Sequence, residues 1–367
     1  MNAYHLREGS SVILDLIRGL SAQAVVIGHA MSFFDVFKSL HEPNFPWIQH
    51  IAVLIFFLLS GYLVTYATVK KLENDSGYTF RHYFADRFSR IYTTFIPALV
   101  FVFIVDLISR YVNISAYNHE HSFNLKTFVV NLFMFQDFKA FSSIPFDNIT
   151  SFGSANSFWS LAVEWWLYML FGFILLVVLK RKSTVFMIPL LLLFSYFPII
   201  NIIGGRGSGL TVFWFFGVFI YVISTTDLLK NVERKFKVIA VLAIVLLAFI
   251  RIYYLMKAYD AVFAFMMAVA LWLIIDLFKD VHFPERLKQL IRFNASYSYT
   301  LYLFHYNILD FMYSHYFNKY NPYLLFVIGF ILSNAISMLV GRYTEVVLTK
   351  KVKSWMYNRL NKKPVNA

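Results

Sequence analysis

Two basic side chains, Arg18 and His29, interrupt an otherwise apolar segment near the N-terminus. An imidazole can act as a general base near neutral pH, and a guanidinium can hold an anion through two parallel hydrogen bonds. The two residues are eleven positions apart, so on a helix they share one face with about 16 Å between them along the axis. Asp15, one turn from Arg18, can neutralise it. The alternative to a functional role is a self-contained Asp15–Arg18 pair and a His29 bonded to a core neighbour.

Glu164 makes a catalytic role for His29 more specific. It follows FWSLAV in a later apolar segment and lies about seven residues inside the outer end of that segment. His29 lies about eight residues inside the outer end of its own segment, so the two residues are expected at similar depth. A paired carboxylate would fix the tautomer of His29 and stabilise its protonated form. Ser160, one turn from Glu164, can hydrogen-bond it. The alternative is that Glu164 only neutralises a basic side chain.

Five further side chains are candidates for substrate binding. Arg87 and Arg90 are one turn apart at the predicted cytoplasmic border, where they could bind phosphates or simply set the topology. Tyr302 and His305 lie on the polar face of a late apolar segment, which lines a substrate channel or forms a packing stripe. Ser60 precedes a glycine at mid-span, a pair that suits close helix packing or a ligand path.

The chain has no cysteine, which excludes disulfides, thiolate metal sites and a cysteine nucleophile. The short patch His119, Glu120 and His121 is expected to be solvated in an outer loop. We therefore expect no metal and no permanently bound cofactor.

Composition predicts the elements that must position these residues. Of the 367 residues, 59% are hydrophobic and only 14% are charged, whereas soluble proteins average about 25% charged. The net charge of +13 could indicate nucleic acid, but the basic residues lie in short loops between apolar segments. Many of these segments are long enough to cross about 30 Å of hydrocarbon. We predict an all-α polytopic membrane protein with about ten spans, at 12–37, 50–69, 91–111, 157–179, 184–203, 209–226, 236–256, 259–279, 295–317 and 322–347.

Loop charge predicts the orientation. The termini and alternate loops on one side carry 23 Lys and Arg, and the other side carries 8. The positive-inside rule therefore places both termini in the cytoplasm. The long segment 112–156 is then outside, and its apolar stretch 123–137 is expected to form an interfacial or re-entrant helix. We expect a transmembrane domain over 1–350 and a cytoplasmic basic tail over 351–367.

Six motifs in order carry a resemblance to a known family. They are RGLSAQAVVIGH, FFLLSGYLV, RFSRIY, FWSLAVEWWLY, SYSYTLYLFH and the late Glu345. Over about residues 10–350 the chain resembles the acyltransferase-3 family of membrane acyltransferases. Thr93 and Thr94 stand where that family commonly has a proline, and Pro97 follows later. Some members add a C-terminal SGNH domain, and this chain is expected to be a stand-alone form.

The resemblance implies a function. Family members typically move an acyl group, most often acetyl from cytoplasmic acetyl-CoA, to sugar hydroxyls across the membrane; acceptors include lipopolysaccharide O-antigen, peptidoglycan and other surface polysaccharides. It implies His29 and Glu164 as catalytic residues, a substrate-binding role for Arg18, and a bacterial inner membrane location. The partners expected are acyl-CoA, a free or lipid-linked glycan and membrane lipids, but no nucleic acid. The rival is a transporter or flippase for a lipid-linked sugar or small organic acid, in which His29, Glu164 and His305 relay protons.

The charge asymmetry predicts the behaviour of a topology reporter. An enzyme that folds only outside the cytoplasm should be inactive when fused to the C-terminus, because the positive-inside rule holds that end in the cytoplasm. The same reporter inserted in segment 112–156 should be active. Activity of the C-terminal fusion would show that the orientation is inverted.

Overall fold

The computed structural model describes residues 5–40, 48–137, 149–180, 185–257 and 259–361. The protein is 79% helical, and no strand occurs in the described ranges. The chain forms two compact units: the first comprises 1–74 and 201–298, and the second comprises 75–200 and 299–367.

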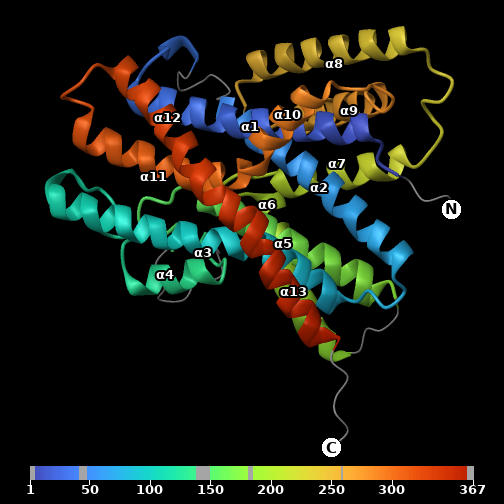
Figure 1. Cartoon of the computed structure of the whole chain (residues 1–367), viewed down its shortest axis with the longest axis horizontal. Coiled ribbons are helices and arrows are strands. Elements are labelled where there is room, and N and C mark those ends of the chain that lie inside the picture. The colour runs from blue at the N-terminus through green and yellow to red at the C-terminus, as the bar shows by residue number, and fades with distance from the viewer. Residues whose placement is uncertain (1–4, 41–47, 138–148, 181–184, 258, 362–367) are drawn as a thin grey trace, which may run out of the picture. The chain divides into compact units, whose positions relative to one another are not determined.

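The first unit holds six helices of the described chain (Figure 1): α1 Glu8–Phe34, α2 Ile48–Asn74, α7 Leu210–Ser224, α8 Arg234–Leu255, α9 Ala261–Leu277 and α10 Glu285–Ser296. Within it α2 packs on α1 and α7, α8 packs on α9, and α10 packs on α1.

The second unit holds α3 Phe80–Val112, α4 Leu125–Leu132, α5 Phe158–Phe173, most of α6 Ile188–Ile203, α11 Ser298–Tyr316, α12 Pro322–Gly341 and α13 Thr349–Leu360. Two π-helical turns extend these elements: Ile174–Val178 follows α5, and Arg342–Leu348 joins α12 to α13. Within this unit α3 packs on α5 and α13.

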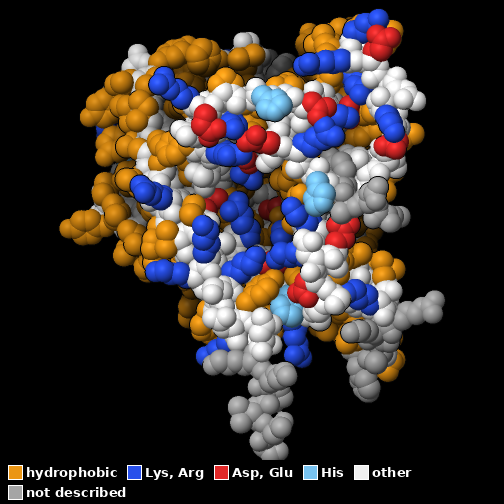
Figure 2. Space-filling model, turned by 45° about the vertical axis from the view of Figure 1, so that its right-hand side comes forward, with side chains coloured by type: hydrophobic (Ala, Val, Ile, Leu, Met, Phe, Trp, Pro, Cys, Tyr) orange, Lys and Arg blue, Asp and Glu red, His pale blue; other side chains and the backbone are white. Residues whose placement is uncertain are grey.

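The all-α polytopic membrane fold predicted from composition is confirmed. Each of the predicted spans overlaps a helix of the described ranges. Six helices are long and apolar enough to cross a membrane, and α6, α7 and α9 are shorter apolar helices. Large apolar side chains such as Leu242, Leu246 and Leu339 are more than half exposed, and hydrophobic side chains cover broad stretches of the surface in Figure 2. Such exposure fits a surface that contacts lipid.

Three features differ from the predicted boundaries. Helix α3 starts at Phe80, well before the predicted span at 91, because Thr79 and His82 form a capping box at its N-terminus. The amphipathic helix α10 occupies what was predicted as a loop. The C-terminal end of α12 continues through a π-helical turn into α13, which runs past residue 351 to Leu360. The apolar stretch 123–137 contains a helix, α4, as predicted.

The α2–α7 contact in the first unit depends on two glycines. A Cβ added to Gly61 would lie 2.0 Å from the backbone oxygen of Trp214, and one added to Gly217 would lie 2.2 Å from that of Leu58. Trp214 is fully buried, and its indole N–H donates to Ser60 Oγ at 3.1 Å. Helix backbones that approach this closely are typical of packing between membrane helices.

In the second unit, Asp106 near the C-terminal end of α3 anchors the segment that follows α4. Its carboxylate is almost fully buried and accepts hydrogen bonds from the backbone N–H of Ser154 at 2.8 Å and the hydroxyl of Tyr117 at 3.1 Å. Gly153 has a φ of +53°, and a Cβ there would lie 1.9 Å from Asp106 Oδ2. Asp106 thereby sets the path of the chain into α5.

The α2–α7 geometry predicts the effect of a single methyl group. We expect Gly61→Ala to destabilise the protein by about 1–3 kcal/mol, because the added methyl meets rigid backbone. The matched control is Gly204→Ala, where an added Cβ has no neighbour within 4 Å. Thermal unfolding of the purified protein measures both. Equal melting temperatures for the two variants would contradict the packing role of Gly61.

Candidate functional site

Arg87 lies between two aromatic rings in the second unit. Its guanidinium carbon is 5.6 Å from the ring centre of Tyr83 and 5.7 Å from that of Tyr168. Across the described part of the chain, no carboxylate forms an ion pair with Arg87, and its Nε is buried without a hydrogen-bond partner. The rings stabilise the cation without using its fork of N–H donors, which remains suited to an anionic ligand.

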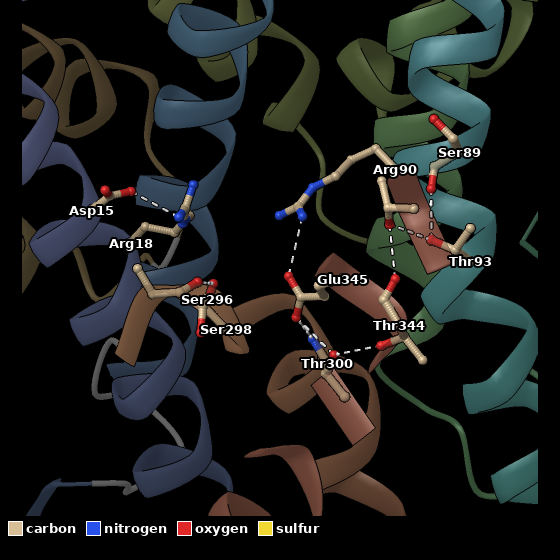
Figure 3. Close-up of polar contacts among 12 residues, drawn as sticks. Asp15, Arg18, Ser89, Arg90, Thr93, Ser296, Ser298, Thr300, Thr344 and Glu345 are labelled. Carbon is tan, nitrogen blue, oxygen red and sulfur yellow. Dashed lines mark hydrogen bonds and ion pairs between the residues drawn. The ribbon is translucent and has the colours of Figure 1, made fainter. Parts of the chain in front are cut away.

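Arg90, one turn further along α3, is already paired (Figure 3). Its Nη1 lies 3.3 Å from Oε2 of Glu345, whose side chain is 2% exposed. The other oxygen of Glu345 accepts from the backbone N–H and the hydroxyl of Thr300, both at 2.8 Å. The Arg90 guanidinium also lies 5.7 Å from the ring centre of Tyr299. The two arginines, equivalent by spacing, therefore differ: Arg90 is neutralised by protein and Arg87 is not.

The turn that carries Glu345 is π-helical, spanning Arg342–Leu348. The hydroxyl of Thr349, just after it, donates to the carbonyl of Thr344 at 2.9 Å and lies 2.8 Å from the hydroxyl of Thr93 in α3. A π-helical turn shifts the direction of the following side chains, and such turns occur frequently at functional sites.

A second carboxylate at the start of α3 fastens α13. Asp86 is almost fully buried and accepts from the hydroxyls of Tyr78 at 2.8 Å and Tyr357 at 3.2 Å. Lys353 Nζ lies 2.9 Å from its other oxygen. Burial and the negative charge of Asp86 raise the pKa of Tyr78, so its hydroxyl stays protonated and donates. The contacts of Asp86 with Tyr357 and Lys353 hold α13 beside the helix turn that includes Arg87.

Glu164 is the one residue from Ser157 to Leu170 that is not buried. It accepts a short hydrogen bond from the hydroxyl of Tyr168, one turn further along α5. Ser160 could reach Glu164 by its spacing, but its hydroxyl lies 3.2 Å from the carbonyl oxygen of Ser157 and makes a short hydrogen bond with Tyr302 of α11. Tyr168 thus connects Glu164 with Arg87 inside the second unit.

His305 is fully buried on α11, with Nδ1 3.0 Å from the carbonyl oxygen of Leu301. Its ring packs 6.0 Å from the ring of Tyr302 and 6.3 Å from that of Tyr306, centre to centre. Its surroundings are those of a packed core histidine. Tyr302 keeps part of its surface accessible.

The remaining predicted site residues lie in the first unit. Arg18 Nη2 donates to Asp15 Oδ1 at 2.8 Å, the local pair anticipated from their spacing (Figure 3). His29 is half-buried on α1. Ser60 accepts from Trp214 in the α2–α7 contact. Because His29 and Glu164 belong to different units, their pairing stays a prediction.

The sequence patterns missed two groups that contribute to the site. The first is the set of aromatic residues around the arginines, Tyr83, Tyr168 and Tyr299; of these only Tyr168 had a local signal, its four-residue spacing from Glu164. The second is the pairing of His119: Glu120 and His121 of the same patch are exposed as expected, but the His119 side chain is only 22% exposed and its Nε2 lies 3.1 Å from both carboxylate oxygens of Asp310. Burial alone would lower the pKa of His119, but Asp310 raises it above its usual value. In the described ranges no group of three His, Asp or Glu could hold a metal ion.

A family model described as an acyltransferase domain, that of the acyltransferase-3 family, matches residues 12–342. The match includes the Arg18, Arg87 and Arg90 positions, His29, Glu164 and the α11 tyrosines. No curated protein and no solved structure gives a significant match.

Proposed function

The chain belongs to the acyltransferase-3 family of membrane acyltransferases, and we propose that it transfers an acetyl group from cytoplasmic acetyl-CoA to a hydroxyl of a surface or lipid-linked glycan. O-antigen or another surface polysaccharide of a bacterial inner-membrane pathway fits this activity. The observation that carries the proposal is the Arg87 guanidinium, which is held between two tyrosines and has no ion pair in the described chain.

At the donor end, Arg87 binds a phosphate of acetyl-CoA. Arginine suits this task because its planar fork matches phosphate oxygens and stacks on aromatic faces at the same time. Arg90, whose charge is already balanced by Glu345, leaves Arg87 as the unpaired cation of this helix turn in the described chain. Arg18 is the third candidate for binding acetyl-CoA, and Asp15 balances its charge before acetyl-CoA binds.

At the reacting end, His29 acts as general base with Glu164 assisting it. The acceptor oxygen attacks the thioester carbonyl carbon while His29 takes the hydroxyl proton. The carbon–sulfur bond then breaks, and CoA leaves as a thiolate that recovers the proton from His29. The products are an O-acetyl ester and free CoA, so no metal or redox group enters the balance. Ser60, Tyr302 and His305 stay candidates for lining the substrate path.

Release of free CoA tests the proposal directly. The purified protein in lipid nanodiscs receives acetyl-CoA and unacetylated surface polysaccharide, and a thiol-reactive dye follows free CoA. The chain contributes no thiol of its own, because it has no cysteine. Acceptor-dependent CoA release supports transfer. Movement of glycan across the bilayer without CoA release would identify a transporter instead.

We expect substitution of Arg87 to weaken the binding of acetyl-CoA. Loss of a charge-assisted hydrogen bond costs about 1.5–3 kcal/mol, so Arg87→Ala should raise the KM for acetyl-CoA about tenfold or more. Arg87→Lys should recover only part of this affinity, because lysine holds phosphate as a point charge.

The matched control for this test is Arg81→Ala, an exposed basic residue on the same helix. It should leave the KM unchanged and lower only the yield of inserted protein if it serves topology. A KM for Arg87→Ala equal to that of Arg81→Ala would remove Arg87 from the donor site.

His29→Ala should lower the rate of transfer about 100-fold or more, because the general base is lost, while acetyl-CoA still binds. Glu164→Gln should keep the shape of the site and lose much of the rate. The exposed His282 provides the control, and His282→Ala should behave like the unchanged protein. Near-normal polysaccharide acetylation by folded His29→Ala would exclude the role assigned to it.

A further inference from the structure

Two polar helix faces meet in the second unit, and together they form what we name the polar seam. On the α5 side, Ser160, Glu164 and Tyr168 recur every four residues, which places them on one face of the helix, and Asn156 lies in the turn just before α5. On the α11 side they are spaced by three or four residues: Tyr299, Tyr302, Tyr306 and Asp310. The α11 side extends about 16 Å along the helix axis.

Hydrogen bonds join the two sides. The amide of Asn156 donates to the hydroxyl of Tyr306 at 2.9 Å, and Ser160 makes its short hydrogen bond with Tyr302. The Tyr302 hydroxyl also lies 3.4 Å from the carbonyl oxygen of Ser157. The contacts repeat at successive turns, so the seam is a continuous feature.

The ends of the seam differ in charge. At the inner end, the hydroxyl of Tyr168 donates a hydrogen bond to Glu164, and the Arg87 guanidinium lies over the Tyr168 ring. At the outer end Asp310 pairs with His119, with side chains 15% and 22% exposed. Among the members of the seam, only the neutral side chains of Asn156 and Tyr306 lie between this pair and Tyr302. The outer half therefore has no excess positive charge to attract a phosphate.

Accessibility on these helices is concentrated on the seam. From Thr300 to Leu309 every residue is buried except Tyr302 and Tyr306. On α5, Glu164 is the accessible residue in a run of thirteen buried neighbours. Packing alone does not explain this pattern, because a polar stripe at membrane depth is costly unless it serves a ligand or an internal path.

We propose that the outer half of the polar seam, formed by Tyr302, Tyr306, Asn156 and the Asp310–His119 pair, binds a sugar residue of the acceptor. Tyrosine combines an apolar ring face, which suits the C–H face of a sugar, with a hydroxyl at its edge. The amide and carboxylate supply the donors and acceptors that neighbouring sugar hydroxyls need. This inference rests on the proposed function and names the residues that recognise its acceptor.

The orientation of α11 gives the site a direction. Asp310 lies three turns beyond Tyr299 on the same face, so a sugar bound at Tyr306 occupies the end of the seam opposite Arg87. Donor phosphate and acceptor sugar would then use opposite ends of one polar surface. The helix–helix hydrogen bonds hold both ends in a fixed register.

Acceptor kinetics test the site in the full-length protein. The probe is surface polysaccharide purified from cells that lack the gene for this chain, with radiolabelled acetyl-CoA as donor. We expect Tyr306→Phe and Asn156→Leu to raise the KM for polysaccharide several-fold and Tyr306→Ala to raise it about tenfold. The dissociation constant for acetyl-CoA, measured by calorimetry, should stay unchanged in all three variants.

The matched control is Tyr254→Ala on α8, a tyrosine that is 79% exposed, which should leave both constants unchanged.

The proposal is overturned if Tyr306→Ala keeps the polysaccharide KM of the unchanged protein. It is also overturned if Tyr306→Phe weakens acetyl-CoA binding and thermal stability as much as acceptor use, because the seam is then only packing. If the unchanged protein binds acetyl-CoA but transfers nothing to polysaccharide, the glycan acceptor itself is wrong. If it does not bind acetyl-CoA, the donor assignment fails first.

Discussion

The cost of placing charge among apolar helices governs this structure. A lone charge in such surroundings is unfavourable by several kcal/mol, so buried ions here have local partners. Asp15 lies 2.8 Å from Arg18, Lys237 lies 2.6 Å from Asp276, and Glu345 joins Arg90 to Thr300. Arg87 departs from this rule, since two tyrosine rings replace a carboxylate. At this exception we propose that the donor phosphate completes the charge balance.

The same constraint explains the arrangement of α3 in the second unit. Within little more than one turn this helix carries Asp86, Arg87 and Arg90, and each has a different environment. Asp86 fastens α13 through Lys353 and two tyrosine hydroxyls. Arg90 binds the π-helical turn between α12 and α13 through Glu345. Both flanking charges bind surrounding helices, and Arg87 between them has an Nε without a hydrogen-bond partner in the described chain.

At the opposite end of the unit, the carboxylate of Asp106 has a comparable structural task. It binds the Ser154 backbone and the Tyr117 hydroxyl, and Asn307 of α11 donates to Ser154 Oγ at 2.7 Å. These contacts fix the start of α5 against α11. The register of the polar seam follows from them, because Asn156 meets Tyr306 only when the chain leaves Ser154 in this direction. Acceptor recognition at the seam would thus depend on a residue that touches no substrate.

The sequence by itself determined the membrane class, the approximate positions of the apolar helices, the family and the pairing of Asp15 with Arg18. Hydropathy and charge are properties of contiguous segments, and an i, i+3 pair needs only one helix. Only the tertiary structure decided the partners that lie far apart in the chain. Ser160 was within reach of Glu164 by spacing, yet it bonds Tyr302, 142 positions away. Likewise, spacing could not separate Arg87 from Arg90, because the carboxylate that neutralises one and not the other comes from a π-helical turn at Glu345. A hydrogen bond forms between groups that are close in space, and spacing along the chain does not give the distance between residues that are far apart in sequence.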